Sequence, residues 1–261
     1  MRLSATTALS PFLFRFIFSG NGIAVACHSP DRELDRVLKE VETLKSHAPR
    51  KFVFFVDDNM FVNRKRSYEL LQALIPYRLR WFVQTDISIA YDDKLLSLMK
   101  QAGCREVLIG FETISPENLR QVNSNDWKLK QYKKYPEAIE RIQSNGIAVY
   151  GSFILGLDRD DRNVFFQLHD FLVETQLIGF QILFQTPIPG TRLAERLAQE
   201  ERLLPHDGNW GNFSTYQVHF TPALMSKEEL EAGMLWLFKK VYNDKAFRRR
   251  KRHYLNLVRR L

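Results

Sequence analysis

The sequence predicts an α/β protein built on parallel strands, either a barrel or part of one, and three observations support this. Five apolar runs each end in polar or glycine-containing residues, and amphipathic helical patterns stand between them. The first run, KFVFFVDDN over residues 51–59, is apolar at every position from Phe52 to Val56, which is typical of a strand buried on both faces. Alternation of strands with helices favours right-handed crossovers and a parallel sheet. A doubly wound open sheet is the alternative.

The expected elements follow one another along residues 29–190. Strands are expected over residues 51–57, 80–86, 106–112, 147–157 and 179–186. A helix begins at the N-cap Ser29 with Pro30 in its first position, and Asn63 and Asp92 begin the next two. Further helices are expected from Ser115, over residues 137–144 and over residues 164–175, with a polar interruption over residues 123–134.

The two ends of the chain differ from this repeating part. Residues 1–28 form an atypical N-terminal segment that has no acidic residue and no clear hydrophobic period. Residues 191–261 are expected to form a helical extension. It contains a helix over 192–203, a further strand over 217–220, a helix that starts at the capping box of Ser226, and a basic tail continuing at helical spacing.

Composition limits the class of protein. With 261 residues and 45% hydrophobic content, the chain can bury one large core, or one core and a small appendage. Its net charge of +8 comes from residues 239–261, which hold ten Lys or Arg and one acid, so the remainder is almost neutral. Two cysteines are too few for a disulfide framework or a cysteine-ligated metal site, and a reducing cytoplasm is expected. The apolar residues 11–19 fall short of the roughly 20 that a membrane-spanning helix needs.

Polar side chains gather where the predicted strands end, and the carboxyl ends of parallel strands are where such folds bind ligands. These candidates are Asp57, Asp58, Asn59, Gln84, Thr85, Asp86, Glu112, Asp158, Gln185 and Thr186. The adjacent acids Asp57 and Asp58 also permit a metal-dependent hydrolase, or simply the N-terminal region of a helix. The histidines show no metal-ligand spacing, and Cys104, between a helix end and a buried strand, is expected to be a core thiol.

Four motifs, in order, resemble those of radical S-adenosylmethionine (SAM) enzymes over about residues 30–245. They are VDDNMF, AGCREVLIGFET, GSFILGLD and TPIPGT, and they are most similar to the branch that carries a cobalamin-binding domain in front. The resemblance implies a partial (β/α) barrel of six parallel strands with a helical C-terminal extension, and SAM lying across the carboxyl ends of the strands. It also implies a small-molecule substrate, with cobalamin-assisted methyl transfer or a rearrangement as the reaction.

The resemblance assigns cofactor-binding roles to particular residues. The end of the second barrel strand, here Asp57, Asp58 and Asn59, would hold the methionine ammonium, because carboxylate and amide oxygens accept its hydrogen bonds. Glu112 would contact the ribose, and Gln84 lies at the neighbouring strand end. The fifth-strand motif would support the adenine ring through Gly151, Ile154 and Gly156, whose small residues allow a flat ring to come close.

One departure from the family pattern limits these expectations. Radical SAM chemistry needs a CxxxCxxC loop to hold a [4Fe–4S] cluster, and Cys27 is the only cysteine before Gly103. Ligands for the cluster and for cobalamin are therefore missing from this sequence. Either the chain is a truncated or frame-shifted product in which residues 1–28 replace the cluster loop, or it is a degenerate relative that remains as a non-catalytic SAM-binding or scaffold barrel.

The basic tail is the one predicted partner surface. Residues 248–252 read RRRKR, and Phe247, Tyr254, Leu257 and Leu261 give the helix an apolar face, so peripheral contact with an anionic membrane is one hypothesis. The alternative is a terminal helix that covers the lower end of the barrel with its basic face in water. The sequence carries no specific nucleic-acid signal.

Overall fold

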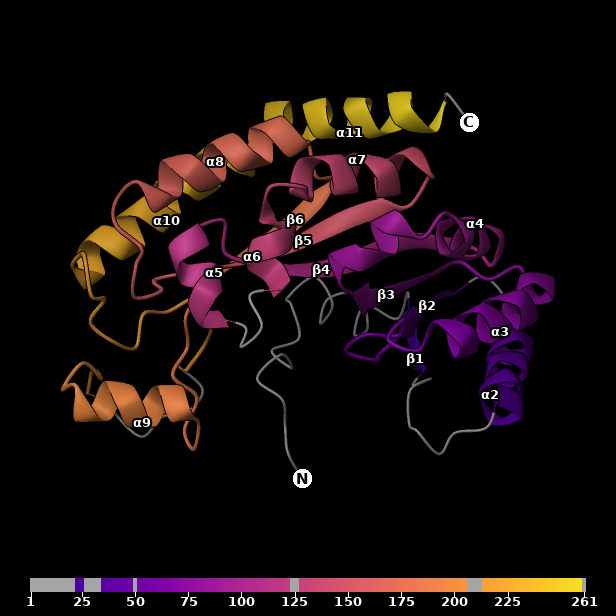
Figure 1. Ribbon diagram of the computed structural model, residues 1–261, viewed down its shortest axis with the longest axis horizontal. Coiled ribbons are helices and arrows are strands. Elements are labelled where there is room, and N and C mark those ends of the chain that lie inside the picture. The colour runs from indigo at the N-terminus through magenta and orange to yellow at the C-terminus, as the bar shows by residue number, and fades with distance from the viewer. Residues whose placement is uncertain (1–21, 26–33, 49–50, 123–126, 206–212, 260–261) are drawn as a thin grey trace.

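The protein contains one six-stranded parallel sheet in a computed structural model that describes residues 22–25, 34–48, 51–122, 127–205 and 213–259 (Figure 1). The strands are β1 (Gly22–Val25), β2 (Phe52–Phe55), β3 (Trp81–Thr85), β4 (Cys104–Glu112), β5 (Ala148–Leu155) and β6 (Gly179–Phe184). Their order in the sheet is their order in the chain. The partial barrel of six strands is thus confirmed, and the doubly wound alternative is wrong because that fold reverses its strand order.

Helices connect successive strands and arc along one side of the sheet, as Figure 1 shows for α3, α4, α7 and α8. The longer helices of the sheet region are α2 (Leu34–His47), α3 (Arg64–Leu74), α4 (Asp93–Gln101), α7 (Tyr135–Ser144) and α8 (Val164–Thr175). Shorter ones are α5 (Pro116–Val122), α6 (Trp127–Tyr132) and the 3₁₀ turns η1 (Ile75–Tyr77) and η2 (Ile87–Tyr91). The C-terminal part adds α9 (Arg192–Gln199), α10 (Lys227–Val241) and α11 (Asp244–Val258).

The two faces of the sheet bury different residues, because successive side chains of a strand point to opposite faces. Val53 and Phe55 of β2 pack into the main core with the helices. Phe54, which lies between them, instead stacks on Phe82 of β3 with ring centroids 4.4 Å apart, in a separate cluster on the other face. The expectation that β2 is buried on both faces is therefore correct.

The helix starts follow the expected capping residues. The side chain of Asn63 accepts a hydrogen bond from the Arg66 N–H, and Asp92 accepts one from Leu95, so both begin the helices predicted from them. Ser226 and Glu229 form the complete capping box at the start of α10. The predicted N-cap Ser29 lies outside the described residues.

Three elements differ from expectation. The atypical N-terminal segment contributes strand β1, and the predicted polar interruption contains helix α6. The helix predicted over 192–203 ends at Gln199, because Glu201 adopts a left-handed φ of 54°.

The strand predicted over 217–220 is also wrong. The segment forms only an isolated antiparallel bridge between Leu203 and Phe220. A turn immediately before it, closed by the Gln217 N–H and the Ser214 carbonyl at 3.2 Å, leaves too little extended chain for a ladder.

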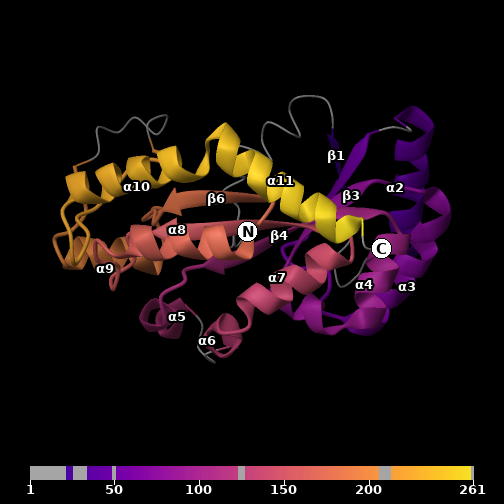
Figure 2. The same cartoon turned by 90° about the horizontal axis from the view of Figure 1, so that it is seen from above.

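Helices α10 and α11 run along the outside of α8 and α7, respectively (Figure 2). Helix α11 is separate from α10 and has its own N-cap, Asn243. Arg250 is buried, donates to the Val241 carbonyl at 2.8 Å and lies 4.8 Å from the Phe180 ring centroid. Tyr254 donates to the Gly146 carbonyl at 2.9 Å. The terminal helix thus packs on the body of the protein, and within the described residues no helix is long and apolar enough to cross a bilayer.

Candidate functional site at the carboxyl ends of the strands

The ends of β2 and β3 are joined by one amide side chain. Asn59 donates from Nδ2 to Asp86 Oδ2 at 2.6 Å and accepts at Oδ1 from the Thr85 hydroxyl at 3.3 Å. Asp57, before it in the chain, is buried, whereas Asp58 is exposed. Three predicted residues, Asn59, Thr85 and Asp86, are therefore brought together in one acidic, hydrogen-bonded group.

A further layer of contacts holds this group in place. The second oxygen of Asp86 accepts from the Ser88 N–H at 2.7 Å, which fixes the start of η2. Arg64, at the start of α3, donates to the Ser88 hydroxyl at 2.8 Å and lies 3.5 Å from Asp92. Because Asp86 is tied to its own backbone turn, its carboxylate keeps a fixed position beside Asn59. Gln84, one residue into β3 from Thr85, is half-buried.

Glu112 ends β4 in an uncommon backbone conformation. Its φ is 64°, and the pairing of β4 with β5 shifts register between Gly110 and Glu112. Lys128 of α6 donates to the Gly110 carbonyl at 2.8 Å and to Glu112 Oε1 at 3.1 Å. The bulge changes the direction of the Glu112 side chain, and Lys128 holds its carboxylate in place. Functional side chains at strand ends are commonly positioned in this way.

The predicted adenine-binding residues of β5 divide between the two faces. Gly151 lies on the side of the main core, where an added Cβ would come within 2.8 Å of the Phe153 ring. Ile154 alternates with buried neighbours and is half-buried on the other face. Gly156 turns the chain after β5 with a φ of 88°. Gly151 therefore packs closely against the main core, whereas Ile154 lies on the face away from it.

A buried carboxylate closes the turn after β5. Asp160 accepts from the backbone N–H groups of Gly156 and Leu157 at 2.9 and 3.0 Å, and from Asn118 of α5 at 2.7 Å. Asn118 in turn accepts from the Arg159 N–H. Burial raises the pKa of Asp160 to about 7, although its hydrogen bonds act in the opposite direction. The sequence did not indicate that Asn118 and Asp160 form a pair, because the two residues lie 42 positions apart in the chain.

Asp158 does not join the other strand-end residues. Its carboxylate forms ion pairs with Arg196 at 2.7 Å and Arg202 at 3.1 Å, both from the C-terminal extension. Arg202 also donates to the Thr221 carbonyl at 2.8 Å. The predicted polar end of β5 therefore anchors the extension to the sheet.

Strand β6 and the residue after it carry polar atoms whose partners are missing within the described part of the chain. The Oε1 atoms of Gln181 and Gln185 are buried and accept no hydrogen bond there. Gln181 donates through Nε2 to the Ser152 hydroxyl at 2.9 Å. Unsatisfied buried acceptors cost free energy, so they are suitable sites for a donor supplied by a ligand or water.

The residues present are not suited to hold a [4Fe–4S] cluster. The sequence has two cysteines, whereas the cluster needs three thiolates. Cys104 is 1% exposed at the start of β4, the edge opposite the strand ends, and burial raises its thiol pKa. It is the core thiol that the sequence predicts, and Cys27 lies outside the described residues. Within those residues, no three His, Cys, Asp or Glu side chains come together as a metal site.

The structure is thus a parallel partial barrel with acidic and amide groups at the carboxyl ends of its strands. Residues 24–172 match the profile of the Radical SAM superfamily, and residues 191–261 match a domain of unknown function (DUF4070). The chain therefore belongs to the Radical SAM superfamily. This match includes Asp57 and Asp58, and it favours the radical SAM expectation over the metal-dependent hydrolase hypothesis.

Curated relatives are methyltransferases and related enzymes. Over 84% of its length the chain is 27% identical to bacteriochlorophyllide d C-12(1)-methyltransferase of Chlorobaculum tepidum, of which it covers 47%. It is 28% identical over 74% of its length to hopanoid C-2 methylase of Rhodopseudomonas palustris, of which it covers 37%. The chain thus spans less than half the length of these relatives.

Solved structures share the fold. The chain superposes on the radical SAM methyltransferase TsrM of Kitasatospora setae, with tryptophan and a SAM analogue bound, at a TM-score of 0.67 and 17% identity. That match covers 92% of this chain and 56% of TsrM. Another TsrM structure contains cobalamin and a [4Fe–4S] cluster.

Proposed function

We propose that this chain binds SAM across the carboxyl ends of β2 to β5 and presents it to a small-molecule substrate, in a methyl-transfer reaction of the cobalamin-associated branch. The observation that carries the proposal is the hydrogen bond of Asn59 to Asp86 at 2.6 Å, which joins two strand ends into one acidic surface. Such a surface is complementary to the ammonium of the SAM methionine. The methyltransferase relatives support the reaction class.

The proposed binding mode assigns a different part of the SAM molecule to each strand end. Asp57, Asp58 and Asn59 receive the ammonium group, and Glu112, held by Lys128, accepts a hydrogen bond from a ribose hydroxyl. The adenine ring lies against Ile154 beyond the end of β5. Gln84 of β3 supplies a further acceptor between these points, and the buried Oε1 of Gln185 supplies one beyond β5, after β6.

Reductive cleavage of SAM requires an electron from an iron–sulfur cluster, and no residue described above is suited to hold one. The proposal therefore assigns SAM and substrate binding to this chain and routes no step through a cluster or through cobalamin. A non-catalytic SAM-binding barrel is the alternative, and it shares the same site. The two differ in whether a small-molecule substrate binds beside the SAM.

Calorimetric titration of the full chain with SAM tests the proposal. We expect one site per chain, at least tenfold weaker binding in Glu112→Gln, and unchanged binding in Glu69→Gln, which removes an exposed carboxylate of α3. Adenosine alone and methionine alone should each bind more weakly than SAM, because each contacts only some of the strand ends. A dissociation constant above about 1 mM for wild type would contradict the proposal.

We also propose that α11 touches anionic membrane from the cytoplasmic side. Phe247 and Leu255 are 48% and 40% exposed on a helix rich in Lys and Arg, and apolar groups beside cations favour the membrane interface. Flotation with phosphatidylglycerol vesicles should carry wild type upward and leave the Phe247→Ser, Leu255→Ser variant behind. Equal flotation of the two proteins, or none of either, would refute the membrane proposal.

A further inference from the structure

A hollow rich in basic side chains lies where the C-terminal extension packs on α8. It has a volume of about 700 Å³ and lies between α8 and the start of α11. Its lining includes His169, Lys240, Lys245, Arg248, Arg249 and Arg252, with Asp244 as the one acid. This volume falls in the range of small-ligand sites, roughly 300–1,000 Å³.

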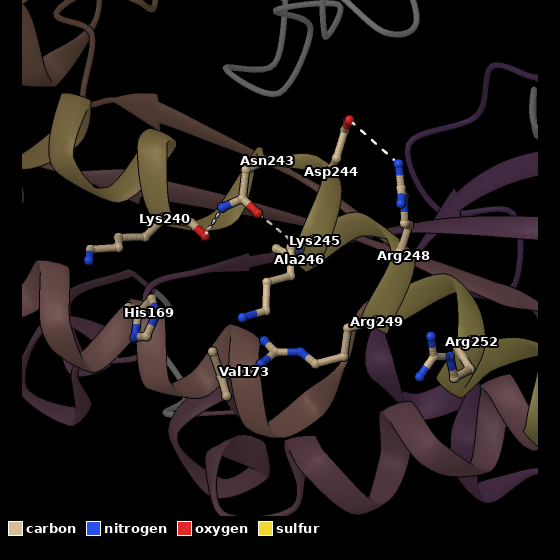
Figure 3. A pocket seen from close by; sticks show the side chains of 10 residues that line it. All are labelled: His169, Val173, Lys240, Asn243, Asp244, Lys245, Ala246, Arg248, Arg249 and Arg252. Carbon is tan, nitrogen blue, oxygen red and sulfur yellow. Dashed lines mark hydrogen bonds and ion pairs between the residues drawn. The ribbon is translucent and has the colours of Figure 1, made fainter.

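Apart from His169, which lies 2.9 Å from Asp170, the cations of this hollow are only weakly neutralised. Asp244 lies 3.9 Å from Arg248, at the distant limit of an ion pair. Lys245, Arg249 and Arg252 form no ion pair with any carboxylate of the described residues. Figure 3 shows the Lys245 ammonium and the Arg249 guanidinium turned toward the same space beside Val173. Lys245 and Arg249 are four residues apart on α11, where like charges repel each other. An anion bound between them would relieve this repulsion.

The body of the protein fixes this orientation. On the opposite side of α11, Arg250 is buried against Phe180, Leu257 is buried, and Tyr254 donates to Gly146. The Asn243 cap sets where the helix begins, at the wall of the hollow. Because α11 cannot rotate without breaking these contacts, its Lys245 and Arg249 side is held toward α8 before any ligand arrives.

We propose that this hollow binds a compact, multiply charged oxyanion of the di- or triphosphate class. Several cations converging on one space match the charge of such a group, and the two arginines can form paired hydrogen bonds to phosphate oxygens. The first turn of α11 adds its positive dipole end to the same wall. The phosphate groups belong either to a soluble ligand or to a phosphorylated lipid headgroup. This site is separate from the strand ends where SAM is proposed to bind.

Calorimetric titration of the full chain with inorganic tripolyphosphate tests the proposal. We expect one site per chain, weakened at least tenfold in Lys245→Gln, Arg249→Gln. The matched control is Lys251→Gln, Arg259→Gln, which removes the same charge from α11 and its C-cap, outside the hollow, and should change the affinity less than twofold. Thermal melting of both variants shows whether they remain folded.

Vesicles identify the source of the phosphate groups. Phosphatidylcholine vesicles with or without a phosphoinositide bisphosphate are sedimented with wild type and both variants, and inositol trisphosphate serves as the soluble competitor. Phosphoinositide-dependent sedimentation that the hollow variant loses assigns the site to a lipid headgroup, whereas tripolyphosphate binding without sedimentation assigns it to a soluble ligand. Absence of both kinds of binding in wild type, or equal weakening in the two variants, would overturn the proposal.

Discussion

Glu112 shows how one residue is held against its backbone preference. A left-handed φ in a residue with a β-carbon costs roughly 1–2 kcal/mol, and at Glu112 it follows the bulge in β4. Lys128 offsets this cost by donating to both Gly110 and Glu112, and both charged side chains are about one-fifth exposed. The strained conformation is therefore coupled to a specific partner, as is common where a side chain must be aimed.

Removing that partner should destabilise the protein. We expect Lys128→Met to lower the free energy of unfolding by about 1–3 kcal/mol, because a half-buried carboxylate and a carbonyl lose a charged donor. Urea denaturation measures the change. In the double variant with Glu112→Gln the two effects should not add, whereas strictly additive effects would show that the lysine does not act through the glutamate.

Asp160 should make stability depend on pH. Its folded pKa of about 7 lies above the unfolded value, so its contribution to stability is fully present below about pH 4 and is lost as the pH rises through 7. The loss is no more than about 4 kcal/mol for a shift of this size. Wild type should therefore lose stability relative to Asp160→Asn between about pH 4 and 7 in denaturant titrations. A difference between the two proteins that is independent of pH would contradict this assignment. Burial also raises the pKa of Glu106 to about 7, but that residue is the same in both proteins, so its effect cancels in the comparison.

At the scale of elements, the sequence predicted those whose ends carry a chemical signal. Apolar runs that stop at acids located β2 and β4, and N-caps such as Asn63 located the helix starts. Helix α6 was missed because WKLKQY has too few apolar residues to show a helical face. Its Lys128 could not be recognised as a site residue for the same reason. The left-handed conformation of Glu112 could not be predicted either, because the residues that indicate such a backbone in a sequence are mainly Gly, Asn and Asp.

Helices α8 and α10 approach each other closely at a glycine. A Cβ on Gly233 would come within 2.1 Å of the Phe165 ring, which is itself buried. We expect Gly233→Ala to destabilise the protein by about 1–3 kcal/mol despite the better helix propensity of alanine. Thermal or urea unfolding should detect this, and Phe165→Leu in the same chain should recover part of the loss. An increase in stability from Gly233→Ala alone would mean that the helices move apart without cost.

At the scale of the whole molecule, the barrel and its extension are joined on two sides. Asp158 at the end of β5 is paired with Arg196 and Arg202 of the extension, while α10 and α11 pack on α8 and α7. The predicted boundary between residues 190 and 191 stays a prediction, but these contacts explain why the extension holds a fixed position. The basic hollow and the carboxyl ends of the strands are consequently separate places on one scaffold.

The location of bound SAM is the central claim, and hydrogen–deuterium exchange of the full chain with and without SAM tests it most directly. We predict slower exchange in peptides covering residues 57–61, 84–88, 110–114 and 152–157, at the carboxyl ends of the strands, and unchanged exchange in α11. Protection confined to α11, or to the amino ends of the strands around Cys104, would contradict the account.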